Sequence, residues 1–296
     1  MSGKLFRGTY TAIVTPFNSD LSIDFDSFKK HLDHQIANGV NGIVVCGSTG
    51  ESATLSTKEK VAMFTTAIEH VNKRVPIIAG SGSNNTQATI DLSLIAKELG
   101  ADATLLVAPY YNKPSQEGLY NHYRLIAEAV DMPHIVYNVP GRSGVNILPE
   151  IQLRLAEECE NIVATKEASG DVEQIMTIVQ HAPANFSVLS GDDAITLPLI
   201  STGVDGVVSV LSNYAPKMFS DLVNFALEDK FEEARELQYK LLDLMKLNFI
   251  EPNPVPAKTA LQMMGMMKDI FRMPLMQITD ASREKMKNAL QQVGLI

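Results

Sequence analysis

Eight short runs of apolar and largely β-branched residues recur along the first two thirds of the 296-residue chain. Each run is nearly continuous, whereas a strand with one face in water alternates apolar and polar residues. Continuous runs of this length are typical of parallel strands covered on both faces. The runs occupy residues 11–14, 42–45, 76–79, 103–107, 134–137, 162–165, 186–189 and 206–210.

Amphipathic stretches with helix-start signals separate these runs. In one of them Glu59 follows Ser56 by three residues, which is the spacing of a capping box. Eight strands that are each followed by a helix predict an α/β protein with a (β/α)8 barrel, also called a TIM barrel. A doubly wound open sheet also alternates strands and helices, but it rarely reaches eight regular units.

The last part of the chain, residues 219–296, has helical periodicity and no strand pattern. No composition break or low-complexity linker precedes it. We therefore expect residues 1–218 to form the barrel and residues 219–296 to form a C-terminal helical extension packed on it.

Composition makes several classes of protein improbable. The net charge of −9 argues against a nucleic-acid binder, and no run of 18 apolar residues is present to span a membrane. Two cysteines, Cys46 and Cys159, are too few for a disulfide framework and indicate a reducing compartment, so we expect a cytoplasmic protein. His31 and His34 lack a third ligand nearby, so we expect them to be solvated and expect no metal site.

Polar residues gather directly after five of the predicted strands. In a (β/α)8 barrel the C-terminal strand ends meet at one mouth, where the chemistry of such proteins takes place. We therefore expect these residues to converge on one site. They are residues 47–51, 109–112, 137–142, 166–170 and 190–193.

Lys166 is the most informative of them, because its side chain begins inside a predicted buried strand. Burial disfavours the ammonium form of a lysine, and the neutral amine attacks carbonyl carbons. The alternative is a structural lysine paired with Glu167 or another carboxylate, since such ion pairs are also common at strand ends.

Other side chains fit a site around Lys166. Tyr137 and Tyr111 carry hydroxyls that transfer protons, although a single tyrosine is more often a packing residue. The small residues around Ser48 allow backbone N–H groups to approach an anion such as a carboxylate. Arg142 follows a Pro-Gly turn and is able to hold a carboxylate with two hydrogen bonds, unless it is simply a solvated loop residue.

These motifs resemble the class I pyruvate aldolase and N-acetylneuraminate lyase superfamily, and within it the dihydrodipicolinate synthase family. The resemblance covers nearly the whole chain, and its motifs occur in the family's order. They are residues 47–51, 109–118, 137–144, 166–170, 189–193 and 251–254.

The resemblance implies that Lys166 forms a Schiff base with pyruvate. The enamine then adds to L-aspartate 4-semialdehyde and gives 4-hydroxy-tetrahydrodipicolinate, in lysine and diaminopimelate biosynthesis. Tyr137, Ser48 and Tyr111 form the proton relay in this scheme, and Tyr111 reaches in from an adjacent subunit of a homotetramer, a dimer of dimers. No metal or organic cofactor is implied.

The resemblance also assigns substrate contacts. Thr49 and Val208 match pyruvate-binding positions, Gly191 lies beside them, and Arg142 matches the residue that holds the semialdehyde carboxylate. Ser48 departs from the more usual threonine but keeps the hydroxyl, so we expect activity with a looser rotamer.

A second departure concerns feedback inhibition by lysine. Members of the family that respond to lysine hold its ammonium with a glutamate, and two histidines lie nearby. The corresponding residues here are Ala88, Thr57 and Lys60. Because a carboxylate is missing and Lys60 adds a like charge, we expect weak or absent inhibition by lysine.

Two other interpretations stay open on the sequence. A sister enzyme, such as N-acetylneuraminate lyase or a 2-keto-3-deoxy sugar-acid aldolase, would share Lys166 and Tyr137, whereas Arg142 and the Tyr110–Tyr111 pair favour the synthase. A non-catalytic regulator that binds small molecules on the same barrel would form no covalent pyruvate adduct.

Overall fold

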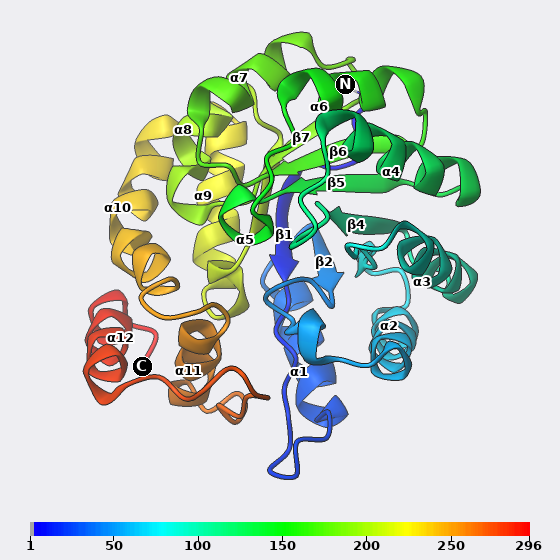
Figure 1. Ribbon diagram of the computed structural model, residues 1–296. Helices are drawn as coiled ribbons and strands as arrows, with labels where there is room; N and C mark the ends of the chain where they lie inside the picture. The colour runs from blue at the N-terminus through cyan, green and yellow to red at the C-terminus, as the bar shows by residue number, and fades with distance from the viewer. Residues whose placement is uncertain (1–2) are drawn as a thin grey trace.

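The computed structural model describes residues 3–296 and has the expected architecture. Eight parallel strands close into a barrel in chain order, so the predicted (β/α)8 fold is confirmed (Figure 1). The strands are β1 (Gly8–Ala12), β2 (Gly42–Val45), β3 (Ile77–Gly80), β4 (Ala103–Val107), β5 (His134–Asn138), β6 (Ile162–Glu167), β7 (Ser187–Ser190) and β8 (Gly206–Ser209).

Helices surround the barrel and connect its strands (Figure 1). Short 3-10 turns follow β2, β7 and β8, namely η1 (Ser52–Thr54), η2 (Asp193–Ile195) and η3 (Leu211–Asn213). The helices that precede the extension are α1 (Phe25–Ala37), α2 (Thr57–Val71), α3 (Thr86–Leu99), α4 (Gln116–Ala129), α5 (Pro140–Ser143), α6 (Pro149–Glu158), α7 (Val172–His181), α8 (Thr196–Ile200) and α9 (Pro216–Leu227).

The hydrophobic core has an inner and an outer part, as expected for strands covered on both faces. Inward-facing residues such as Val44, Leu105 and Val208 form one buried cluster inside the barrel. Three larger clusters fill the space between the outer strand faces and the helices. The sequence capping box at Ser56 is present, because its hydroxyl accepts from the Glu59 backbone and the Glu59 side chain accepts in return.

The first strand begins three residues earlier than the apolar run at residues 11–14 predicts. Thr9 and Thr11 are polar, yet both are fully buried. The Thr11 hydroxyl lies 2.7 Å from Gln35 Oε1 and 2.9 Å from Ser212 Oγ, so its burial leaves no hydrogen bond unmade. A search for apolar runs therefore misses the start of this strand, where polar residues are buried.

The expectation that His31 is solvated is wrong. His31 is 1% exposed, because it lies on the face of α1 that packs toward η3. Its Nε2 atom lies 3.1 Å from Asn213 Oδ1, which fixes the ring in the core. Among residues 3–296, no three His, Cys, Asp or Glu side chains lie together as metal ligands would.

The C-terminal extension shares a core with the barrel. Its further helices are α10 (Phe231–Leu247), α11 (Val255–Met263) and α12 (Asp280–Val293), which lie along one side of the barrel (Figure 1). One buried cluster joins Val14 and Val207 of the barrel region to Leu241, Leu261 and Leu290. The boundary expected at residue 218 falls inside α9 and stays a prediction.

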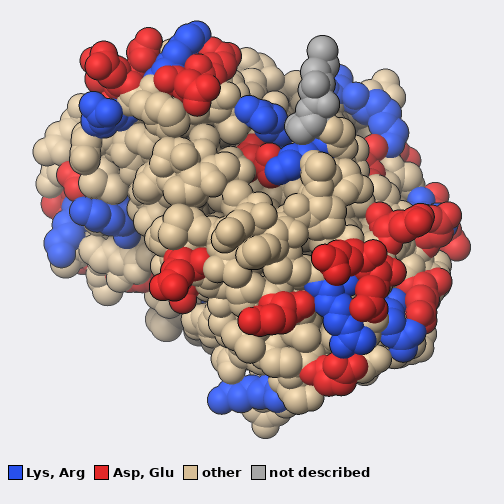
Figure 2. Space-filling model, turned by 90° about the horizontal axis from the view of Figure 1, so that it is seen from above, with Lys and Arg blue, Asp and Glu red and all other residues tan. Residues whose placement is uncertain are grey.

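The surface carries both signs of charge. In the view from above, Lys and Arg side chains are interspersed with Asp and Glu (Figure 2). No helix within residues 3–296 is long and apolar enough to cross a membrane.

His134 is a buried titratable group within the barrel wall. Its Nε2 atom lies 2.9 Å from the carbonyl oxygen of Val130, and its Nδ1 atom lies 2.6 Å from Thr104 Oγ1. Because a carbonyl oxygen only accepts hydrogen bonds, Nε2 of His134 carries the proton. Nδ1 then accepts a hydrogen bond from the Thr104 hydroxyl, and the imidazole ring is neutral. Burial lowers the pKa of His134 to about 4, with the bond to Val130 opposing the shift.

This lowered pKa predicts a loss of stability on acidification. Between about pH 6.5 and pH 4 the unfolded chain protonates this ring and the folded chain does not, which costs about 1.4 kcal/mol per pH unit. His134→Gln should therefore make the free energy of unfolding less dependent on pH in this interval, as measured by urea denaturation at several pH values. His181→Gln, which alters an exposed ring, is the matched control. Equal slopes for wild type and His134→Gln would contradict a neutral buried ring.

Candidate active site

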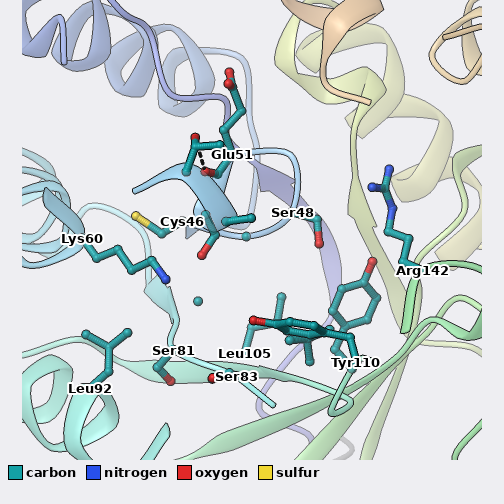
Figure 3. A pocket seen from close by; sticks show the side chains of 18 of the residues that line it. Cys46, Ser48, Glu51, Lys60, Ser81, Ser83, Leu92, Leu105, Tyr110 and Arg142 are labelled. Atoms are coloured by element: carbon teal, nitrogen blue, oxygen red, sulfur yellow. Dashed lines mark hydrogen bonds between the residues drawn. The ribbon is translucent and has the colours of Figure 1, made fainter. Parts of the chain in front are cut away.

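A cavity of about 610 Å³ opens at the C-terminal ends of the strands. Ser48, Tyr137 and Arg142 line it, so three of the predicted site residues meet in one place. Figure 3 shows Ser48 and Arg142 at this cavity. Asn253, Pro274 and Leu275 of the C-terminal extension line it as well. The extension is therefore part of the wall of this site.

Lys166 lies in β6 and is 6% exposed. Its register neighbour in β5 is Tyr137, and its Nζ atom lies 4.1 Å from the centre of the Tyr137 ring. Within residues 3–296, no carboxylate lies within 4.0 Å of the Lys166 ammonium. Lys166 itself does not line the cavity, but the Tyr137 ring against which its ammonium packs does, and the lysine side chain is buried without an ion pair.

The alternative in which Glu167 neutralises Lys166 is wrong. Successive residues of a strand point to opposite faces, so Glu167 points outward to α6 and α7. Its carboxylate is buried, which raises its pKa, while hydrogen bonds from neighbouring side chains lower it. The donors are Asn138 at 2.9 Å, Gln152 at 2.8 Å, Gln174 at 3.2 Å and the Ser169 backbone at 3.0 Å.

Residues 47–51, which we call the 47–51 turn, link β2 to η1. Ser48 lines the cavity, whereas Thr49 is buried and accepts a hydrogen bond of 3.0 Å from Asn253 Nδ2. The Gly50 amide donates to the Gly47 carbonyl at 3.0 Å, which closes the turn. The turn thus places Ser48 at the cavity, while the Thr49 hydroxyl is engaged by Asn253.

Gly191 and Val208 do not line the cavity. A Cβ atom built on Gly191 would come within 3.0 Å of Lys166 Cε and 2.6 Å of Ala168 Cβ. Glycine is therefore required for the Lys166 side chain to occupy its position. Val208 is fully buried in the inner cluster that also contains Tyr137.

The two tyrosines after β4 have different environments. Tyr110 lines the cavity and is 41% exposed. Tyr111 is 89% exposed, has a φ of 72° and does not line the cavity of its own chain. Within residues 3–296 the site is therefore brought together without Tyr111.

Arg142 comes from α5, the short helix that begins at Pro140 directly after β5. Its side chain is exposed and points along the cavity edge (Figure 3). No carboxylate of residues 3–296 pairs with this guanidinium. The group is positioned to receive an anion from solution.

The sequence interpretation missed the contribution of the C-terminal extension. Asn253 stands in the Glu251–Pro252–Asn253–Pro254 motif, which was noted as a family likeness without a role. Cys46, expected to be an inert buried thiol, lines the cavity, and burial raises its pKa to about 12. In the sequence, the signal that points to Asn253 is its position between two prolines in an otherwise helical region.

Comparisons with known proteins identify the family. Residues 5–293 match the model of the dihydrodipicolinate synthetase family, so the chain belongs to this family. A 4-hydroxy-tetrahydrodipicolinate synthase of Methanocaldococcus jannaschii is 47% identical over 292 residues, covering 99% of this chain and 100% of the relative.

Solved structures agree with this assignment. The dihydrodipicolinate synthase of Thermotoga maritima superimposes with a TM-score of 0.97 at 43% identity, covering 99% of this chain and 100% of the other. The enzyme of Cyanidioschyzon merolae, solved with lysine bound, has a TM-score of 0.96 at 39% identity, with coverage of 99% and 100%.

The Glu167 network predicts a specific cost for removing its charge. Ile147 N donates to Asn138 Oδ1 and Thr165 donates to Gln152 Oε1, so these two amides are locked with their N–H groups toward Glu167. Glu167→Gln brings another N–H₂ group into contact with them and should lower the free energy of unfolding by about 2–3 kcal/mol.

Urea denaturation measures this loss. Glu160→Gln, which changes an exposed carboxylate seven residues earlier in the sequence, is the matched control and should change stability by less than about 0.5 kcal/mol. If Glu167→Gln were as stable as wild type, the carboxylate would not be the acceptor that the network requires.

Proposed function

We propose that this chain is a lyase that condenses pyruvate with L-aspartate 4-semialdehyde to give 4-hydroxy-tetrahydrodipicolinate, a step of lysine and diaminopimelate biosynthesis. The observation that carries the proposal is the buried, unpaired amine of Lys166 beside Tyr137, at the end of a barrel strand. Full-length similarity to enzymes named for this reaction supports the choice of substrates.

The reaction begins with attack of Lys166 Nζ on the keto carbon of pyruvate. Loss of water leaves an imine, which draws electrons from the methyl group so that it loses a proton and becomes an enamine. The enamine carbon bonds to the aldehyde carbon of the semialdehyde. The substrate's own amine then attacks the imine carbon, which closes the ring and releases Lys166.

Each site residue has a role in this scheme. Tyr137 exchanges protons next to the imine, and Ser48 and Tyr111 extend the relay to solvent. Thr49, Gly191 and Val208 surround the pyruvate. Arg142 holds the semialdehyde carboxylate with two hydrogen bonds. The protein's amine is the electron sink, so the scheme uses neither a metal nor an organic cofactor.

We further propose a homotetramer built as a dimer of dimers, in which Tyr111 completes the site of a neighbouring subunit. The high exposure of Tyr111 and its absence from the cavity of its own chain support this role. A cytoplasmic location is supported by the free state of both cysteines, Cys46 and Cys159.

The decisive test compares aldehydes. We expect pyruvate consumption with L-aspartate 4-semialdehyde to exceed that with N-acetylmannosamine or glyceraldehyde by at least about 100-fold, because only the first offers a carboxylate in reach of Arg142. Lys166→Met should abolish the reaction and the borohydride-trapped pyruvate adduct.

The Arg142→Ala variant tests recognition of the semialdehyde separately from formation of the pyruvate adduct. It should lower kcat/KM for the semialdehyde about 100-fold while the pyruvate adduct still forms on Lys166. A preference for a sugar aldehyde would instead assign the chain to a sister aldolase. Absence of any adduct in the wild type would favour a non-catalytic regulator.

The residues that correspond to the lysine-binding positions of the family lie together in this structure. Thr57, Lys60 and Ala88 all line the cavity, the first two from α2 and Ala88 from α3. The Lys60 side chain points into it (Figure 3). Ala88 offers no carboxylate to an ammonium, and the Lys60 ammonium repels it. Burial lowers the pKa of Lys60, with the nearby Cys46 opposing, which marks this amine as part of the cavity wall.

We therefore expect full activity at about 1 mM lysine, where a binding free energy of about −4 kcal/mol would already give half occupancy. Initial rates measured over a lysine series check this. Ala88→Glu combined with Lys60→His should increase inhibition, because it supplies a carboxylate and removes the like charge. Half-inhibition of the wild type below 1 mM would contradict the prediction.

A further inference from the structure

Lys258 and Glu51 form an ion pair that is closed off from solvent. Lys258 lies on α11 in the C-terminal extension, and Glu51 is the last residue of the 47–51 turn. The Lys258 Nζ atom lies 2.7 Å from Glu51 Oε1, and both side chains are 0% exposed. The pair therefore joins the extension directly to the turn that carries Ser48 and Thr49.

The surroundings of Lys258 hold its ammonium in one place. Nζ lies 4.5 Å from the ring centre of Phe17 and 4.7 Å from that of Phe271, and it donates a hydrogen bond to the Ile270 carbonyl. The backbone N–H of Arg272 lies 3.4 Å from the second carboxylate oxygen of Glu51. Cation, carboxylate and rings thus fix one another away from the protein surface.

The 47–51 turn needs such an external restraint. Cys46 before it and Glu51 at its end have φ values of 57° and 53°, the left-handed region that non-glycine residues rarely adopt. Conformations of this kind persist where the surrounding structure imposes them. The Glu51 side chain, tied to α11, provides that force at one end of the turn.

A second contact from the extension reaches the middle of the turn. Asn253 Nδ2 donates to Thr49 Oγ1 at 3.0 Å, and the Asn253 side chain is buried at the cavity wall. Two successive parts of the extension therefore fix two residues of one five-residue turn.

A buried ion pair is a poor means of gaining stability alone. Removing two charges from water costs free energy that their attraction often fails to exceed, and apolar residues of equal volume would frequently serve as well. A directional pair does, however, specify where its carboxylate lies. The free-energy cost of burying the two charges is explained if the pair serves to fix the position of the turn and not to raise stability.

We infer that Lys258, acting through Glu51, and Asn253, acting through Thr49, are positioning residues that hold the Ser48 hydroxyl and the Thr49 amide at the pyruvate site. The inference rests on the proposed function for the roles of Ser48 and Thr49. It assigns to the C-terminal extension a part in the chemistry of the barrel mouth.

The test removes both charges together, because a single replacement would strand a buried ion. The double variant Glu51→Gln with Lys258→Met should fold and show kcat/KM for pyruvate lowered by about 10- to 100-fold, the cost of misplacing reacting groups by about 1 Å. Borohydride trapping of pyruvate on Lys166 should slow as well. Hydrogen exchange of the backbone amides of residues 47–51 should become faster.

The matched control breaks an ion pair at the opposite end of the barrel. Lys4 Nζ lies 2.8 Å from Asp205 Oδ2, and Asp205 is nearly buried. Lys4→Met should lower the melting temperature without changing kcat, KM or exchange in the 47–51 turn. A merely structural role for Lys258 predicts that the double variant behaves like this control.

Each remaining outcome is decisive. If the folded double variant keeps kcat and KM within twofold of the wild type, the inference is overturned. If it does not fold, Glu51→Asp decides, because this variant keeps both charges and shortens the side chain by one methylene group. Wild-type kinetics and exchange in Glu51→Asp would overturn the inference.

Failure of the proposed function has a different signature. A wild-type protein that forms no pyruvate adduct would refute that function before any variant is compared. Hydrogen exchange of the 47–51 turn, which needs no substrate, still decides whether the Lys258–Glu51 pair holds the turn. Unchanged exchange in the folded double variant would refute the positioning role.

Discussion

Closure of eight parallel strands is the constraint on which the rest of the structure depends. Parallel pairing in chain order brings every C-terminal strand end to one mouth, so residues separated by tens of positions become neighbours. Closure also buries both faces of each strand, which explains the continuous apolar runs in the sequence. The same burial leaves Lys166 only 6% exposed, and no carboxylate of residues 3–296 lies within 4.0 Å of its ammonium.

Alternation along β6 then separates two neighbouring charged residues. Lys166 points into the barrel, while Glu167 points out and accepts hydrogen bonds from neutral amides. A period of two residues is a property of any strand, so this separation follows once the strand is recognised. One strand thereby directs a lysine to its inner face and a hydrogen-bonded carboxylate to its outer face.

Local patterns in the sequence predicted the fold and three of the residues that line the cavity. The apolar runs identified all eight strands, although the first strand begins at Gly8, three residues before its predicted run, because Gly8 and the buried Thr9 carry no apolar side chain. Ser48, Tyr137 and Arg142 were predicted to converge, and they line one cavity. The roles of Asn253 and Lys258 could not be predicted in this way. Lys258 and Glu51 are 207 residues apart, and no local pattern encodes a contact at that separation.

The shared wall of the cavity has a consequence for synthesis of the chain. Asn253, Pro274 and Leu275 leave the ribosome after all eight strands, so a nascent chain with a complete barrel sequence still lacks one side of its pocket. The pocket is therefore complete only after residue 275 has been translated. A chain that terminates before residue 253 would carry Lys166 but an unfinished pocket.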